Sequence, residues 1–147
     1  MFSIALLALT TGAPTHGDKN HEVVLPGAIT WVDGPASLPK GAKMAILEGD
    51  PGKEGEFVLR VKLPDGFRIA PHTHPKDERV TVLQGTLFLG MGMDPKTAKE
   101  MPAGSYGRTG AGMVHFGWVK GETILQLHGT GPWAIVYVNP ADDPRRR

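Results

Sequence analysis

Cysteine is absent from this chain of 147 residues, so the protein has no disulfide, no thiolate zinc site and no cysteine nucleophile. All soft-metal chemistry must therefore rest on histidine, of which there are six. A large net charge is also missing. The 16 basic and 15 acidic residues are interspersed and give a formal net charge of +1, so nothing in the charge pattern indicates nucleic acid binding.

The chain also lacks an apolar run long enough to span a membrane. The apolar run at residues 1–13 ends in small residues and is similar to the hydrophobic segment and cleavage zone of a secretory signal peptide, although no Lys or Arg precedes it. We therefore expect an exported, periplasmic protein; the alternative is a cytoplasmic protein in which this run forms an N-terminal strand. Residues 14–39 would then be a leader with the first strands, and its His16 and His21 are expected to face solvent.

Helical periodicity is missing as well, whereas glycine (20) and proline (13) are abundant and separate short apolar runs. This rhythm predicts a single all-β domain of about ten strands with little helix, followed by a solvated tail at 141–147. About two turns of surface helix are expected at 94–100. Strands are expected at 23–25, 29–32, 43–48, 57–63, 72–74, 78–83, 86–91, 115–120, 123–128 and 133–138.

Three histidines and one carboxylate stand out as metal-ligand candidates. His72 and His74 are one residue apart, so on a strand both side chains point the same way. Pro75 to Asp77 forms a predicted turn, after which Glu78 opens a returning strand beside the histidines. With His115 from later in the chain, these side chains can make a four-point cage of nitrogen and oxygen donors for one divalent transition metal: Mn, Fe, Ni, Co, Cu or Zn.

The glycines around these residues complete two longer motifs. The first reads Gly66-x5-His72-x-His74-x3-Glu78-x6-Gly85, and the second places Gly104 and Gly112 before His115. Together they resemble the two conserved motifs of the cupin superfamily, with Gly110 and Val119 standing where the second motif usually has Pro and Asn.

The resemblance spans residues 40–140 and implies a jelly-roll β-sandwich or barrel in which His72, His74, Glu78 and His115 bind the metal. It also implies a cavity for a small molecule. Cupins carry many reactions, so two functions stay open. One is a metalloenzyme with dioxygenase- or lyase-type chemistry on an oxygen-bearing, metal-chelating substrate. The other is an exported metal- or ligand-binding protein without turnover.

Further polar candidates are less well defined. Gln126 and His128 share one face of a predicted strand, so either can line the cavity, where His128 would act as a general base; a water-facing position is the alternative. Tyr106 is the second catalytic candidate, and Arg60 is more often solvent-facing in such a pattern. Open sheet edges and surface aromatic residues predict a homodimer. Four aromatic residues are expected in core or interface packing: Phe88, Phe116, Trp118 and Trp133.

Overall fold

The computed structural model describes residues 22–146. The predicted signal peptide at 1–13, and with it His16 and His21, lies outside the described residues, so export stays a prediction. Within the described range, no helix has the length and apolar character needed to cross a membrane.

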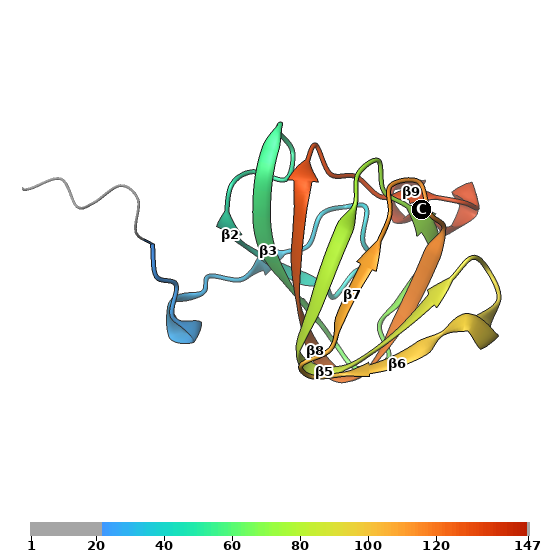
Figure 1. Cartoon of the computed structure of the whole chain (residues 1–147), viewed down its shortest axis with the longest axis horizontal. Helices are drawn as coiled ribbons and strands as arrows, with labels where there is room; N and C mark the ends of the chain where they lie inside the picture. The colour runs from blue at the N-terminus through green and yellow to red at the C-terminus, as the bar shows by residue number, and fades with distance from the viewer. Residues whose placement is uncertain (1–21, 147) are drawn as a thin grey trace, which may run out of the picture.

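The described residues form one curled antiparallel sheet of nine strands, with one short 3-10 turn before β1, one between β5 and β6 and two after β9. Figure 1 shows this sheet curving into a barrel-like fold, from which the segment before β1 extends on one side. The strands are β1 (Val32–Asp33), β2 (Lys43–Glu48), β3 (Gly55–Leu63), β4 (Arg68–Thr73), β5 (Glu78–Met91), β6 (Lys99–Pro102), β7 (Tyr106–Thr109), β8 (His115–Gly131) and β9 (Val136–Tyr137). The 3-10 turns are η1 (Pro26–Ala28), η2 (Pro95–Thr97), η3 (Pro140–Asp142) and η4 (Pro144–Arg146). The predicted all-β jelly-roll class is confirmed.

Two long strands, β5 and β8, divide the sheet into two halves that face each other. The first part of β5 and the last part of β8 pair with each other and with β7 and β3, forming what we call the β3 half. The last part of β5 and the first part of β8 pair with β6 and β4, forming the β4 half. The hydrophobic core lies between the halves and includes Phe57, Leu59, Leu63 and Val82.

Each long strand passes between the halves at a glycine. Gly85 in β5 has φ +74° and Gly121 in β8 has φ +74°, a left-handed conformation that only glycine adopts readily. The sequence predicted a separate strand on each side of these glycines, at 78–83 and 86–91 and at 115–120 and 123–128. The structure shows instead that both strands continue through them, because a positive φ at one residue bends a strand without ending its pairing.

We expect Gly85→Ala to lower the free energy of unfolding more than Gly121→Ala. Both substitutions carry the left-handed strain, of roughly 1–2 kcal/mol. At Gly85 the added Cβ would also overlap Thr123 and the carbonyl of Glu122, whereas at Gly121 it meets open space. Overpacking adds about 1–3 kcal/mol. Urea unfolding of the two variants measures the difference, and equal losses would contradict the packing at Gly85.

Several expected elements differ in the structure. The strand expected at 23–25 is absent, and the one expected at 29–32 is reduced to β1, because the segment there is interrupted by η1. The helix expected at 94–100 is only the single turn η2, since residues from Lys99 onward pair with β5 as strand β6. Backbone pairing to a neighbouring strand outweighs the weak helical preference of this polar segment.

Candidate metal centre

His72, His74 and His115 come together at one end of the space between the halves. His72 lies in β4, and His74 is the first residue after the end of β4. His115 is the first residue of β8, and its backbone pairs with that of His72. All three side chains are buried, and one ring nitrogen from each lies within 4.8 Å of the others. The alternation predicted for His72-Thr73-His74 places both imidazoles in the same interior, because Thr73 points the other way.

Glu78 reaches the same point from the opposite half. Its carboxylate oxygens lie 3.5 Å from Nε2 of His74 and 3.5 Å from Nε2 of His115, and its side chain is 13% exposed. These distances are too long for strong hydrogen bonds. They are the spacing of donors arranged around a common centre, so the structure brings all four predicted ligands to one place.

The backbone orients each imidazole through its other nitrogen. Nδ1 of His72 lies 2.7 Å from the carbonyl oxygen of Ala70, and Nδ1 of His74 lies 2.8 Å from that of Ala134. Nδ1 of His115 lies 3.1 Å from the carbonyl oxygen of Met113. Because a carbonyl only accepts, each Nδ1 carries a proton and donates it, which leaves Nε2 with a lone pair in the neutral ring.

Two of these nitrogens are buried without a hydrogen-bond partner in the described structure, namely Nε2 of His74 and Nε2 of His115. Buried polar atoms are nearly always paired, so two unpaired ring nitrogens facing one carboxylate require an explanation. A divalent cation at their common centre would satisfy both, and backbone-anchored imidazoles are the usual arrangement of histidine ligands. The residues present therefore fit a transition metal.

The electrostatics of the cluster keep His72 neutral and Glu78 ionised, which are the protonation states that bind a metal. Burial, with repulsion from His115, lowers the pKa of His72 to about 3, so this ring is neutral at ordinary pH. Burial alone would raise the pKa of Glu78, but the imidazoles of His115 and His74 outweigh it and hold the pKa below its usual range. Burial likewise disfavours the charged form of His74, yet Glu78 outweighs it and raises the pKa of His74.

The predicted hairpin between the histidines and Glu78 is wrong, although the proximity of these residues is right. β4 pairs with β8 and β9, while β5 pairs with β6, β7 and β8, so β4 and β5 are not neighbours. Residues 75–77 instead carry the chain from one half to the other. Asp77 accepts a hydrogen bond from the Ala111 N–H, and Gly112 N–H donates to the His74 carbonyl, which ties this connection to the segment before His115.

A cavity of about 60 Å³ adjoins the four candidate ligands. Apart from these ligands and Trp133, its described wall is apolar, with Leu63, Val80, Leu125 and Leu127 among the lining residues. A low-dielectric wall strengthens electrostatic interactions inside such a site.

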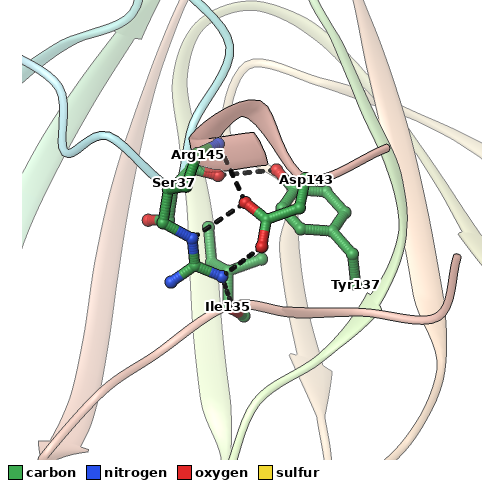
Figure 2. A network of polar contacts seen from close by, with 5 residues as sticks. All are labelled: Ser37, Ile135, Tyr137, Asp143 and Arg145. Carbon is green, nitrogen blue, oxygen red and sulfur yellow. Dashed lines mark hydrogen bonds and ion pairs between the residues drawn. The ribbon is translucent and has the colours of Figure 1, made fainter. Parts of the chain in front are cut away.

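A polar network fixes two segments that border the cavity (Figure 2). Arg145 forms an ion pair of 2.8 Å with Asp143 and donates to the carbonyl of Ile135, and the Tyr137 hydroxyl donates to the carbonyl of Ser37. Burial, together with the Asp143 charge, raises the pKa of Tyr137 to about 12, so its hydroxyl stays a donor. Ile135 and Leu38, the neighbour of Ser37, both line the cavity. Arg145, expected in a solvated tail, therefore belongs to the folded structure.

The catalytic candidates lie away from the cavity. Leu125 and Leu127 line it, so Gln126 and His128 lie on the opposite face of β8, where Gln126 contacts His128 at 3.0 Å. Arg60 lies on that outer face too and donates to Gln126 at 2.9 Å. Tyr106 is 61% exposed. Of the two positions that the sequence left open for Gln126 and His128, the structure shows the outer one: burial of the two leucines decides which face of β8 points inward. The catalytic roles of His128 and Tyr106 find no support in this geometry.

Two features of the centre were not predicted from the sequence. Trp133, expected only in packing, borders the cavity and stacks on the His74 ring at 4.9 Å between centroids. The carbonyls of Ala70, Met113 and Ala134 orient the imidazoles, and no sequence signal could have found them because every residue has a carbonyl.

Comparison with known proteins agrees with the fold. A family model described as "ChrR Cupin-like domain" matches residues 19–134. The polyketide cyclase RemF from Streptomyces resistomycificus has a TM-score of 0.66 at 18% identity, over 86% of this chain and 91% of that one. A putative acetylacetone dioxygenase from Methylibium petroleiphilum PM1 has a TM-score of 0.65 at 19% identity, over 88% and 89%.

An acetylacetone dioxygenase from Acinetobacter johnsonii has a TM-score of 0.63 at 15% identity, over 92% of this chain and 88% of that one. At these identities the likenesses show a shared fold and leave the activity open. No curated protein matches the chain.

Proposed function

Because the chain belongs to the ChrR cupin-like family, we propose that it is a metal-binding cupin that takes a small oxygen-bearing molecule beside one divalent transition metal. His72, His74, His115 and Glu78 would hold the metal. The observation that carries the proposal is the pair of buried, unpartnered Nε2 atoms of His74 and His115, which face the Glu78 carboxylate. When bound, such a metal would supply a Lewis acid with positions open to a ligand.

The chain's own residues would orient the ligand and exclude water. His72 stays neutral because its pKa is about 3, and Glu78 stays ionised because its pKa is lowered. Both side chains are therefore already in the protonation state that binds a metal. Three neutral imidazoles and one carboxylate leave a divalent ion with a net charge of about +1, which favours an anionic or enolisable oxygen ligand. The apolar wall excludes bulk water from that ligand.

Our leading proposal is an enzyme with dioxygenase- or lyase-type chemistry on a small chelating substrate. The support is the fold shared with proteins described as acetylacetone dioxygenases and a polyketide cyclase. The alternative is a metal- or ligand-binding protein without turnover. The cavity favours that alternative in one respect: in its described wall, the titratable side chains are the four candidate ligands themselves, so no separate acid or base is at hand.

Purification without chelator, followed by elemental analysis, tests the metal. Oxygen-uptake and product assays with short β-diketones, other enolisable compounds and catechols then test turnover. Metal-dependent conversion of any of these would support the enzyme. Stoichiometric metal without conversion across the panel would favour the binding protein, and protein free of metal after incubation with each candidate ion would contradict both.

We expect the metal affinity of the native protein to fall as the pH drops through the raised pKa of His74, starting above its ordinary value of 6.5. The reason is that a metal must displace the proton that Glu78 helps His74 to hold. In Glu78→Gln this support is lost while burial remains, so the decline should begin at lower pH, on top of a weaker overall affinity. Competition titrations from about pH 5 to about pH 8 measure both curves. An unchanged onset in the variant would contradict the coupling.

The homodimer also stays a prediction. The half-exposed aromatic stack of Phe88 and Trp118, on the outer face of the β4 half, offers a surface for it. A light-scattering mass near the monomer value of 15.7 kDa would contradict the dimer.

A further inference from the structure

Trp133 carries a buried hydrogen-bond donor that nothing in the described structure uses. Its indole Nε1 is buried without a partner, although the ring itself borders the cavity beside the metal centre. Two aromatic contacts hold the ring in place. It stacks on His74 at an interplanar angle of 22°, and it makes an edge contact with Phe57 at 6.2 Å between the ring centroids. A ring fixed in this way cannot readily turn to find another acceptor.

The chemistry of this group defines what it can receive. An indole N–H only donates, so its partner must bring an acceptor atom. The other polar side chains on the described cavity wall are His72, His74, Glu78 and His115, which are the candidate ligands. A molecule in the cavity that Trp133 lines can therefore bring the missing acceptor.

The size of the cavity limits the molecule that brings the acceptor. Its volume of about 60 Å³ has room for about four to six waters, at 10–15 Å³ for each. The net charge of about +1 at a loaded centre favours an anion. A short-chain carboxylate matches both limits, because one oxygen can lie at the metal while the carboxylate also accepts from a neighbouring donor.

We infer that Trp133 is a positioning residue whose indole N–H donates to an oxygen of a small carboxylate held at the metal centre. This inference rests on the proposed function, since it assumes that the four ligands hold a metal. It adds a residue that orients the bound molecule and the chemical class of that molecule.

Nuclear magnetic resonance of the ¹⁵N-labelled, zinc-loaded protein tests the inference with acetate as the probe. The chain has three tryptophans, so three indole signals are expected, which substitution to phenylalanine assigns. Acetate should move the Trp133 indole proton downfield in a saturable manner and leave the other two unmoved. Trp31 lies under Lys62 and Trp118 lies against Phe88, both outside the cavity. Metal-free protein and equal concentrations of chloride should cause no shift.

Trp133→Phe gives the matching affinity measurement, because it keeps an aromatic ring against His74 and removes the N–H donor together with part of the indole ring, a loss that Trp118→Phe reproduces outside the cavity. We expect its zinc content to equal that of the native protein and its acetate affinity, measured by calorimetry, to fall about tenfold or more, as for hydrogen bonds to charged groups. Trp118→Phe is the control and should retain native affinity.

The outcomes separate the two proposals. Native protein that takes up no metal would overturn the proposed function and this inference with it. Zinc-loaded protein that binds no acetate, or binds it without moving the Trp133 signal, would overturn only the inference. Native acetate affinity in Trp133→Phe would do the same.

Discussion

Replacing His74 with alanine is expected to lower the bound metal from about one per chain to a small fraction. His74 lies between β4 and β5 and supplies one of three imidazoles whose ring nitrogens lie within 4.8 Å of one another. Loss of groups that merely orient ligands already costs about 10–100-fold in metal affinity, so the loss of a ligand should cost more. Elemental analysis after gel filtration measures the metal content of variant and native protein.

His128→Ala is the matched control for this experiment. It removes the same type of side chain from β8, but on the face opposite the cavity, so its metal content should stay native. Circular dichroism of both variants checks that the fold persists. Full metal occupancy in His74→Ala would mean that the cage is wrongly assigned, and equal losses in both variants would mean that the metal binds elsewhere.

The second large effect expected is on thermal stability when the metal is removed. The candidate ligands come from β4, β5 and β8, and Glu78 faces the histidines from the other half of the sheet, so a bound ion joins both halves. A ligand at 100 times its dissociation constant stabilises the folded state by about 2.7 kcal/mol. For a domain of this size, that corresponds to a rise in Tm on the order of 10 °C.

Calorimetric melting of chelator-treated protein, with and without added zinc, measures this shift. The His74→Ala variant serves as the control and should melt at nearly the same temperature in both conditions. If the Tm of the native protein does not change with metal, the ion does not bind the folded state more tightly than the unfolded state. That result would contradict the proposed centre.

The sequence predicted that the four candidate ligands lie together, because their residue types and their spacing are distinctive. The interval between His72 and His74 forces both imidazoles to one side of a strand, whatever the strand pairs with. The partners of that strand were not predictable in this way. β4 and β5 looked like a hairpin because they are close in sequence, yet the hydrogen-bonding edges of β4 are occupied by β8 and β9, which come from much later in the chain.

The direction of a strand face was the second difficulty. Alternation places Gln126 and His128 together and Leu125 and Leu127 together, but it does not say which pair points inward. A polar cavity would have favoured the first pair. The structure has an apolar one, so the leucines line it and the polar pair lies outside. The position of Trp133 at the cavity was not predictable for a related reason. Its proposed role depends on a single unpaired nitrogen, which the sequence does not show.

The sharing of β5 and β8 between both halves constrains how this protein can change in length. An extra residue in the turn around η2 or in the loop before β3 lies outside the paired strands. One extra residue within β8 beyond Gly121 would reverse the inward and outward side chains that follow it, against β3 and β5 together. Insertions and deletions among related chains should therefore gather in those two loops, while the intervals from Glu78 to Met91 and from His115 to Gly131 stay constant.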